Sequence, residues 1–491
     1  MVLFKNYLLS IYLLLKNILK VIYMLRTHDC GKLRKEDENK EVILCGWVSS
    51  IRKAGKNIIF IDLRDRYGIT QVIVLKDLIE KLDFLDSIKQ EYVLRVKGKV
   101  QVKPKLNPKL KTGEIEVLLE DIEILNTCED TLPIEVTGDL LATEETRLKY
   151  RYLDLRRKDM LENFIFKQKV VSSIRNFLNL QNFLDVDTPM LCRSTPEGAR
   201  DYIVPSRLNP GMFYSLPQSP QVYKQTLMVS GFDRYYQLAK CLRDEDLRGD
   251  RQPEFTQLDL EMSFITKEDI QDVFEKMLKI MFKDVLNKEI TIPFPHISYK
   301  ESMEKYKCDK PDLREDKTNK EEFVFVWIDN FPLFEMNETE NRVVSAHHPF
   351  TQATNDSWDK LNACKTNEDY LALYSESFDL VLNGVELGSG GMRIHDSSKQ
   401  KTIFNILGLT DDEVKEKFGF LLDAFKFGTP PHGGFAIGID RLLMLLKGRD
   451  SIKDFIAFPK TKSGVALMEN APNAVSDKQL KDISIKVDLD K

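Results

Sequence analysis

The sequence predicts an α+β protein with a small all-β domain ahead of a larger domain of strands and helices. Three observations support this prediction. The chain has 491 residues, more than one hydrophobic core normally supports. Five β-rich runs follow one another between residues 42 and 125, and beyond residue 156 polar strands alternate with helical patterns. The composition, 42% hydrophobic and 30% charged, is that of soluble globular proteins.

The five β-rich runs have the number and spacing of an OB-fold barrel, which we expect over residues 24–126. Between Tyr92 and Gly113 there are seven Lys or Arg residues and no acid. A basic hairpin on such a barrel either follows a phosphate backbone or is simply solvated, and the sequence leaves both open. The runs are residues 42–48, 57–63, 70–75, 92–102 and 114–125.

A linker or hinge is expected over residues 127–155, because Leu132-Pro133 breaks the chain there. The end of this segment, EETRLKYRYLDLRR, is a basic and helical entrance to the second domain, which we expect over residues 156–491. Apolar spacing then predicts a helix over Asn163–Asn179 and a strand over Phe183–Pro189. A helix that is simply buried in the core would show the same spacing.

The stretch Lys240–Met262, KCLRDEDLRGDRQPEFTQLDLEM, predicts a charged β-hairpin. It enters through an apolar strand, turns at Gly249 and leaves with strand-like alternation. Charge runs are usually solvated loops. Here, however, polar side chains continue into the second strand, which favours a ligand on that face. Nearby patterns predict a strand over residues 213–217 and helices over 220–229 and 267–288.

Several classes of site are disfavoured by what the sequence lacks. No GxGxxG opens a βαβ unit and no GxxxxGK[ST] is present, which removes the two commonest nucleotide cradles. The formal net charge of -5 argues against indiscriminate nucleic-acid binding. Seven cysteines without a CxxC pair favour reduced thiols over disulfides or zinc, and a reducing compartment. The adjacent His347 and His348 suit a metal poorly.

The first 23 residues differ from the rest and their status stays open. Their longest uncharged run, Asn6–Leu15, is too short to span a bilayer. A secretory segment would need a small-residue cleavage site, and an organellar presequence would need arginine. A start at Met24 is the favoured interpretation. We therefore expect a cytoplasmic protein with no membrane span, and organellar targeting by residues 1–23 is not excluded.

The hairpin resembles motif 2 of the class II aminoacyl-tRNA synthetases, and GFAIGIDRLLMLL (residues 434–446) resembles motif 3. Thr188-Pro189 is similar to motif 1. TPEGARDY, LPQSPQVYKQ, AHHPFT and FGTPPHGG resemble strings of the bacterial-type aspartyl-tRNA synthetases. The resemblance runs from about residue 25 to the last few tens of residues. It implies an anticodon-binding barrel and a catalytic domain whose mostly antiparallel sheet is flanked by helices.

One departure from that family lies between CDKPDLR (residues 308–314) and VWIDNFPLFE (residues 326–335). The bacterial enzymes carry a large inserted domain between such strings, whereas this chain has a short charged linker. We expect the active site to be untouched, because the loss falls between strands. Any tRNA contact that the insert makes is in doubt here.

The resemblance implies an aspartate–tRNA ligase, which uses ATP to attach L-aspartate to tRNA-Asp through an aspartyl-adenylate and releases AMP and pyrophosphate. The sequence leaves open whether tRNA-Asn is also charged. Arg243 would hold the α-phosphate and the substrate carboxylate, and Arg441 the γ-phosphate, since arginine binds such anions bidentately. These two are the catalytic residues implied. The ATP contacts implied are Arg243, Asp244, Glu245, Gln252, Phe255, Glu386, Gly438, Ile439, Asp440 and Arg441.

Other roles follow from the same resemblance. Lys224 and Arg393 would pair with the side-chain carboxylate of aspartate, so Lys224→Ala is expected to abolish aspartate activation and leave melting normal. Alone, Lys224 would be a solvated helix lysine. Asp379 and Glu386 would hold Mg²⁺, although without the motifs they would be ordinary surface carboxylates. The residues implied to bind aspartate are Glu197, Ser219, Gln221, Lys224, Arg243, Asp259, His347 and Arg393.

On the barrel, the resemblance implies that Phe60 stacks on an anticodon base and that Gln71 and Arg52 contact the anticodon, although each could be an ordinary strand residue. It also implies a homodimer built on the Asn163–Asn179 helix and motif 1. Two other functions compete. A catalytically silent RNA-binding paralogue is disfavoured by the intact motif arginines, and an ammonia-using asparagine synthetase would not need the barrel.

Overall fold

The computed structural model describes residues 25–489 except 139, 195–197 and 339–340. The N-terminal extension expected at residues 1–23 lies outside the described residues. The chain divides into two compact units between Ala142 and Thr143, inside the segment expected to be a linker. Over the described residues, no helix combines the length and the apolar character that a bilayer crossing requires.

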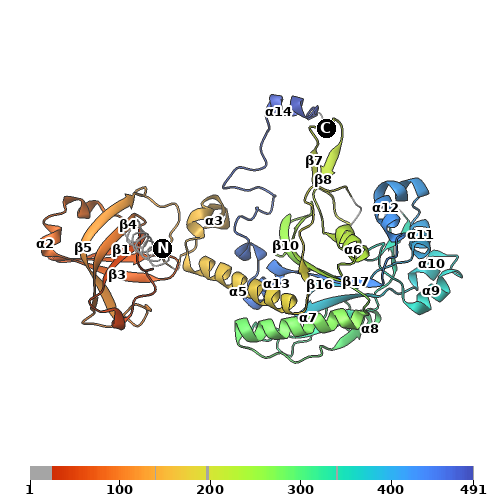
Figure 1. Cartoon of the computed structure of the whole chain (residues 1–491), viewed down its shortest axis with the longest axis horizontal. Helices are drawn as coiled ribbons and strands as arrows, with labels where there is room; N and C mark the ends of the chain where they lie inside the picture. The colour runs from red at the N-terminus through yellow and green to blue at the C-terminus, as the bar shows by residue number, and fades with distance from the viewer. Residues whose placement is uncertain (1–24, 139, 195–197, 339–340, 490–491) are drawn as a thin grey trace, which may run out of the picture. The chain divides into compact units, whose positions relative to one another are not determined.

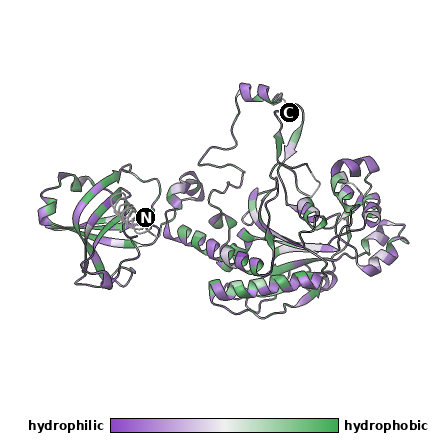
Figure 2. Cartoon of the chain, in the orientation of Figure 1, coloured by the Kyte–Doolittle hydropathy of each residue, from purple (hydrophilic) through white to green (hydrophobic). Residues whose placement is uncertain are grey.

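The first unit contains a closed five-stranded barrel in the order β1-β2-β3-β5-β4. Burial alternates along its strands: Ile59, Ile61 and Leu63 of β2 are buried inside, while Phe60 and Asp62 face outward. Figure 2 shows hydrophilic and hydrophobic residues interleaved along the barrel strands. The predicted OB-fold barrel is confirmed. Its elements are η1 Lys35–Asp37, β1 Glu41–Ala54, β2 Ile58–Arg64, β3 Ile69–Leu75, α2 Lys76–Ile79, η2 Asp83–Ser87, β4 Val93–Val102 and β5 Ile115–Asn126.

The second unit is built on an eight-stranded sheet in the order β11-β12-β15-β16-β17-β10-β9-β6. Its six central strands pair antiparallel, and only the two edge strands pair parallel. This confirms the mostly antiparallel sheet. The strands are β6 Leu184–Asp185, β9 Arg234–Leu242, β10 Glu254–Ser263, β11 His296–Ser298, β12 Phe325–Asp329, β15 Ser377–Leu382, β16 Val385–Met392 and β17 His432–Gly438.

Helices and two small sheets surround this sheet (Figure 1). The small sheets are β7 Ile203–Pro205 with β8 Phe213–Ser215, and β13 Phe334–Asn337 with β14 Arg342–Ser345. The helices are α3 Glu144–Lys149, α4 Arg151–Asp154, α5 Lys158–Leu180, α6 Gln221–Val229, α7 Lys267–Met281, η3 Phe282–Leu286, α8 Tyr299–Tyr306, α9 Asn355–Leu361, α10 Asn367–Leu371, α11 Ser397–Ile406, α12 Asp411–Phe425, α13 Ile439–Leu446, η4 Ile452–Phe455 and α14 Asp477–Asp482.

Alternation along β10 separates a core face of the sheet from a polar face. Leu258, Leu260 and Met262 are buried in one hydrophobic cluster with residues of α5, α7 and α13. Asp259 and Glu261 therefore lie on the opposite face, because successive strand residues point to opposite sides. Helix α6 covers that face and packs with α11 and α12. The polar face of β10, which the sequence predicted, therefore lies beneath α6.

Glycines allow β16, β17 and β10 to approach closely. A Cβ at Gly390 would lie 2.3 Å from the Gly434 carbonyl oxygen, and one at Gly434 would lie 1.7 Å from Glu261 Oε2. The glycines of β16 (Gly388, Gly390 and Gly391) therefore serve close strand packing. At Gly434 the missing side chain makes room for a carboxylate.

Gly434→Ala is therefore expected to destabilise the second unit by at least about 3 kcal/mol, because the added methyl group overlaps a buried carboxylate and the Leu260 carbonyl. Thermal unfolding of the purified variant measures the loss. Gly419→Ala is the matched control, since its Cβ would meet only Lys415 Cγ at 3.5 Å in the middle of α12. The control should gain roughly 0.5–1 kcal/mol from helix propensity. Equal midpoints for the two variants would contradict the packing argument.

Two elements differ from the prediction. The strand expected over Phe183–Pro189 shortens to β6, because beyond Val186 the chain bonds through side chains, as in Thr188 Oγ1 to Gln237 Oε1 at 2.9 Å. The helix expected to reach residue 288 ends at Met281. It continues as a π-helical turn that Asn287 terminates with φ 54°.

Candidate active site

A cavity of about 380 Å³ opens on the polar face of the large sheet, between α6, the β9–β10 hairpin, β16 and the start of α13. Arg243, Arg441, Lys224 and Arg393 all line this one cavity. The arrangement matches the convergence of cations that the motifs predict. The other predicted residues that line it are Ser219, Gln221, Glu245, Gln252, Phe255, Asp259, His347, Glu386, Gly438 and Asp440.

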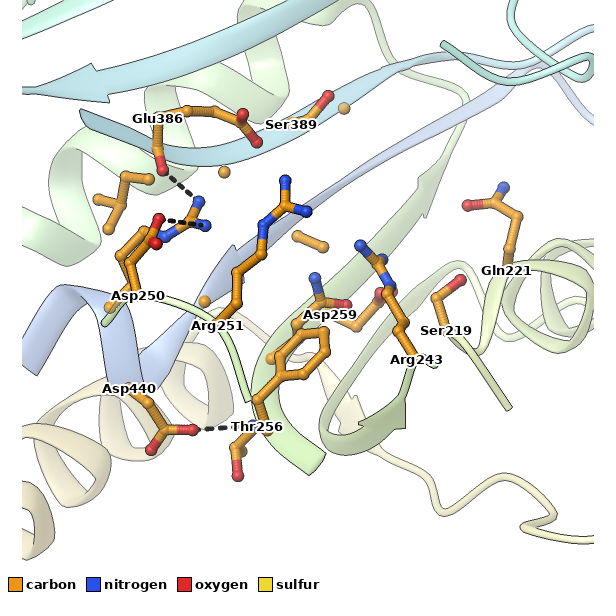
Figure 3. Close-up of a pocket in the computed structure, with 18 of the residues that line it drawn as sticks. Ser219, Gln221, Arg243, Asp250, Arg251, Thr256, Asp259, Glu386, Ser389 and Asp440 are labelled. Carbon is orange, nitrogen blue, oxygen red and sulfur yellow. Dashed lines mark hydrogen bonds and ion pairs between the residues drawn. The ribbon is translucent and has the colours of Figure 1, made fainter. Parts of the chain in front are cut away.

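Arg243 is the cation with the fewest commitments in the cavity. Its Nε donates to the Gln218 carbonyl at 3.5 Å, and its guanidinium lies 5.4 Å from the centre of the Phe255 ring. No carboxylate among the described residues pairs with it. Figure 3 shows its side chain pointing into the cavity towards β16. The remaining N–H groups of its planar fork are therefore available to an anion.

Arg441 and Arg251 are held by acids of the hairpin turn. Arg441 donates to the Glu386 carbonyl at 2.7 Å and pairs with Asp250 at 3.5 Å, the contacts drawn as dashed lines at Glu386 and Asp250 in Figure 3. Arg251 pairs with Glu245 at 3.2 Å. These pairs are partly exposed, so they hold the arginines in place weakly and can be exchanged for a stronger anion. The half of the cavity near α13 suits a polyphosphate.

At the α6 side of the cavity, two cations and two acids form a buried network. Lys224 Nζ lies 2.7 Å from Asp259 Oδ1 and 3.2 Å from Glu261 Oε2. Arg393 binds the same Glu261 through Nε at 3.0 Å and Nη2 at 3.4 Å, and also donates to the Gly434 carbonyl. The side chains of all four are at most 5% exposed.

Burial and pairing act in opposite directions on the two acids. Burial raises the pKa of Asp259, and the nearby Lys224 only partly offsets this. Burial also disfavours ionisation of Glu261, but Arg393 and Lys224 outweigh it and lower its pKa. Lys224 has one further N–H, and Nη1 of Arg393 donates to no described residue. The network thus holds Lys224 and Arg393 in place, and each keeps an N–H donor for the carboxylate of a ligand.

The two adjacent histidines are neutral donors or acceptors rather than charges. Burial lowers the pKa of His347 to about 4 and that of His348 to about 3, with Arg393 and Lys224 adding to the effect on His348. His348 Nδ1 accepts from the Phe350 N–H at 3.3 Å, so its Nε2 carries the proton. That Nε2 is buried and has no partner among the described residues. His348 therefore offers a donor that the sequence did not single out.

Asp379 and Glu386 lie close together, but only Glu386 lines the cavity. Burial, followed by the charge of Glu386, raises the pKa of Asp379 well above its usual value. Its Oδ1 is buried without a hydrogen-bond partner among the described residues. Two neighbouring carboxylates with an unmatched oxygen fit a hard divalent cation such as Mg²⁺.

The raised pKa of Asp379 predicts a pH-dependent stability. The folded protein keeps the proton to a higher pH than the unfolded chain, so stability is complete below the unfolded value and falls as pH rises through the folded value. Asp379→Asn should remove this fall, and Mg²⁺ with ATP should reverse it only in the original protein. Unfolding midpoints measured from pH 5 to pH 9 with and without Mg²⁺ check this, and identical pH profiles would contradict it.

Some predicted residues lie elsewhere or are already engaged. Asp244 is directed outside the cavity, 3.7 Å from Arg200, and Ile439 is fully buried in the core, so neither lines the cavity. The Gln252 amide is taken by the backbone of Lys460, to which it donates at 3.2 Å and from which it accepts at 2.8 Å. Glu197 falls among the residues that the structure does not describe.

Asp440 is a brace between three elements. Its Oδ2 accepts the Thr256 N–H at 2.9 Å, and its Oδ1 binds Lys167 Nζ of α5 at 2.7 Å. Figure 3 shows the bond to Thr256 at the start of α13. Both oxygens of its carboxylate are therefore occupied in joining the hairpin, α5 and α13, next to Arg441.

Among the cavity residues and their partners that the sequence reasoning missed, Glu261, Arg251 and His348 matter most for the charge and hydrogen bonding of the site. Glu261 lies on the same side of β10 as Asp259, so strand alternation was the signal that could have found it. Arg251 stands in the predicted turn beside Gln252, and nothing local marks it as facing inward. His348 follows the predicted His347, and only the three-dimensional structure shows that both rings line the cavity.

On the barrel, the predicted anticodon residues gather around one acid on the outer face. Asp62 pairs with Arg52 at 3.2 Å and accepts from the Gln71 amide at 3.4 Å. Phe60 is half-buried on β2 directly opposite Arg52. Burial lowers the pKa of Lys103, which begins the basic β4–β5 connection and interacts with Asp62. The three predicted residues and the basic segment therefore belong to one surface.

Comparison with known proteins supports both units. Residues 143–462 match the family described as tRNA synthetases class II (D, K and N), and residues 42–125 match the OB-fold nucleic acid binding domain. The Aspartate--tRNA(Asp/Asn) ligase of Caldanaerobacter subterraneus is 40% identical over 94% of this chain and 98% of its own. The ligase of the same name from Desulfatibacillum aliphaticivorans is 41% identical, and the Aspartate--tRNA ligase of Macrococcus caseolyticus 38%, each over 95% of this chain and 98% and 99% of its own.

The alignment with the Caldanaerobacter protein runs over 593 positions, more than the 491 residues here, so that relative has segments without a counterpart in this chain. This agrees with the shortened linker between α8 and β12. Among solved structures, asparaginyl-tRNA synthetase from Pyrococcus horikoshii superposes with a TM-score of 0.71 at 21% identity, over 89% of this chain and 99% of its own. Aspartyl tRNA synthetase from Entamoeba histolytica gives 0.67 at 22%, over 88% and 91%. These structures share the fold.

Proposed function

This chain belongs to the class II aminoacyl-tRNA synthetases, among the aspartate–tRNA ligases, and from that premise we propose how its residues select aspartate and pass it to tRNA. The enzyme joins L-aspartate to tRNA-Asp with ATP as co-substrate. The observation that supports the proposed roles most strongly is the meeting of Arg243, Arg441, Lys224 and Arg393 in one cavity.

In the first step, the α-carboxylate of aspartate attacks the α-phosphorus of ATP and pyrophosphate leaves. Two anions must be brought together, so fixed cations lower the barrier. Arg243, the uncommitted cation, binds the α-phosphate and the attacking carboxylate, and Phe255 stacks on the adenine ring. Arg441 and Arg251 hold the departing pyrophosphate end. No described side chain needs to act as a general base, because the attacking carboxylate is already ionised.

Mg²⁺ is the metal that the site fits. Asp379 and Glu386 would hold it, and it would screen the charge of the phosphates while Arg243 orients the α-phosphate. The Oδ1 of Asp379 is buried and has no hydrogen-bond partner among the described residues. This oxygen is therefore already in place to bind the cation.

Charge in the buried network selects aspartate over asparagine. The remaining donors of Lys224 and Arg393 bind the side-chain carboxylate, and the neutral His348 Nε2–H adds a third donor. Asparagine would leave these donors facing an amide N–H₂ group. Rejection of that kind is worth several kcal/mol, on the order of breaking a buried ion pair. Ser219, Gln221 and Asp259 surround the substrate ammonium on the other side.

Aspartate-dependent exchange between ATP and pyrophosphate tests the first step. We expect exchange with L-aspartate and at least a thousandfold less with L-asparagine, by about 4 kcal/mol of discrimination. Exchange with asparagine alone would overturn the pocket assignment. The absence of any exchange would favour the catalytically silent paralogue. The presence of the barrel already disfavours an ammonia-using synthetase.

Both tRNA-Asp and tRNA-Asn are candidate acceptors, because the names of several close relatives include both. Parallel aminoacylation of purified tRNA-Asp and tRNA-Asn with labelled aspartate separates the possibilities. Charging of both tRNAs with similar kcat/KM identifies a non-discriminating enzyme, and charging of tRNA-Asp alone identifies a discriminating one.

The barrel face around Asp62 is proposed to bind the anticodon, with Phe60 stacking on a base. Phe60→Ala should raise KM for tRNA about tenfold or more, since one stacked base is worth about 1–3 kcal/mol, and should leave exchange unchanged. Tyr67→Ala is a control, because Tyr67 is an exposed aromatic outside the Asp62 cluster. Equal effects of the two variants on KM for tRNA would refute the assignment.

We also propose a cytoplasmic homodimer. Large apolar side chains are exposed where α5 ends and motif 1 follows, including Leu180 at 81%, Leu184 at 50% and Leu191 at 52%, which suits a protein partner. All seven cysteines are free, as expected in a reducing compartment. Light scattering at micromolar concentration measures the oligomeric state, and a monomer would contradict the dimer.

A further inference from the structure

A run of four hydrogen-bonding groups connects the loop before β17 with the proposed aspartate site. His432 Nδ1 lies 2.8 Å from the Pro430 carbonyl oxygen, and His432 Nε2 lies 3.2 Å from Gln225 Nε2. Gln225 Oε1 then lies 3.2 Å from Gln221 Nε2. His432 and Gln225 are fully buried, and Gln221 is nearly so. We name these three side chains the α6–β17 relay.

The direction of the relay follows from its first member. A carbonyl oxygen can only accept, so His432 Nδ1 must donate to Pro430. In a neutral imidazole the other nitrogen then accepts, and Gln225 must present its N–H₂ group to His432. The Oε1 of Gln225 therefore faces Gln221 and accepts from its N–H₂ group. This leaves the Gln221 oxygen directed to the other side.

That free oxygen is on the substrate side. Figure 3 shows the Gln221 amide with its oxygen on the side of Arg243 and Ser219 and its nitrogen turned away. Gln221 also lines the cavity, at the start of α6. An amide oxygen at this place can accept a hydrogen bond from an ammonium group, whereas an amide N–H₂ would repel it.

We propose that His432 and Gln225 are positioning residues that hold the Gln221 amide with its oxygen towards the ammonium group of the bound amino acid. This inference rests on the proposed function, because Gln221 must contact the substrate. It goes further in assigning roles to two residues that do not touch the substrate and that lie 207 positions apart in the chain.

The surroundings of His432 keep the relay in one direction. Burial lowers the pKa of His432, and Arg393 and His395 act in the same sense, while Glu261 and the bond to Pro430 favour the proton. A second proton would make both ring nitrogens donors. Gln225 would then have to turn over, and Gln221 would present N–H₂ to an ammonium group. Neutral His432 is therefore what keeps the amino-acid site receptive.

A double-substitution cycle tests the relay in the aspartate-dependent exchange assay. His432→Leu and Gln221→Ala should each raise KM for aspartate about tenfold, the order of one hydrogen bond to a charged group, and leave KM for ATP within twofold. The double variant should be no worse than Gln221→Ala alone, since the relay acts only through Gln221. His432→Gln, whose amide oxygen can accept from Gln225, should recover most of the loss.

His395→Leu is the matched control, because His395 is outside the relay and has the smallest influence on the pKa of His432, which burial dominates. This variant should leave KM for aspartate unchanged. Additive effects in the double variant, or a loss in His432→Gln equal to that in His432→Leu, would overturn the proposal. A normal KM in Gln221→Ala would also overturn it while the parent enzyme stays active. Absence of exchange in the parent enzyme would instead count against the proposed function.

Discussion

Arg243→Met is expected to lower kcat/KM for aspartate-dependent exchange about a thousandfold, which corresponds to about 4 kcal/mol of transition-state stabilisation. Arg243 is the cavity cation that pairs with no described carboxylate, so its guanidinium is free to bind the anionic groups of ATP and aspartate. Its position over the Phe255 ring, 5.4 Å from the ring centre, fixes the guanidinium at low entropic cost. Most of the loss should fall on kcat, because the charge on the α-phosphate grows during the reaction.

Arg234→Met is the matched control for this experiment. Arg234 lies at the other end of β9, is 5.5 Å from the Phe183 ring, and donates to the Gln181 carbonyl at 3.3 Å. It therefore shares the packing of Arg243 but lies outside the cavity. Arg243→Lys should remain at least tenfold impaired, because an ammonium cannot bind two oxygens in the same plane. A normal kcat in Arg243→Met would remove Arg243 from the reaction.

Lys224→Met is expected to abolish measurable aspartate activation and also to lower the free energy of unfolding by about 3–5 kcal/mol. The first effect follows from the loss of the side-chain carboxylate's partner. The second follows because Asp259 and Glu261 would stay buried with half of their compensating charge removed. The expectation of a normally melting Lys224→Ala variant must accordingly be revised, since that expectation treated the lysine as bound only to substrate.

Exchange assays with aspartate and thermal unfolding of the same preparation separate the two effects. Adding Asp259→Asn to Lys224→Met should recover part of the stability, because it removes one of the stranded carboxylates, and should recover none of the activity. Unchanged turnover in Lys224→Met would exclude this lysine from the amino-acid site. Unchanged stability would show that water replaces the ammonium group in the network.

Local sequence signals predict much of this fold because they depend on neighbouring residues. The alternation in β10 and the charged turn after Leu242 were enough to place the hairpin, and the barrel strands follow from their spacing. Arg243 and Arg441 could be assigned to one site because each stands in a sequence string that resembles a known motif, Arg243 in motif 2 and Arg441 in motif 3. Local sequence signals do not predict features that depend on a contact between segments far apart in the chain.

Glu261 illustrates the limit. Its side of β10 was predictable, but its two cationic partners come from α6 and from the end of β16, and no local pattern connects them. For the same reason the sequence could not show that Asp244 leaves the cavity or that Gln252 is tied to Lys460. The space for Glu261 is made by Gly434, so a glycine that looks like a strand weakener is a condition for the charge network.

Asp440 gives the nucleotide end of the enzyme a mechanical link to α5. One carboxylate holds Lys167 of that helix and the backbone of the hairpin, and the next residue is Arg441. A shift of α5 would therefore be transmitted through Asp440 to the start of α13, where Arg441 lies. If two protomers meet along α5, as proposed, this carboxylate would connect the two nucleotide ends of the pair through that helix.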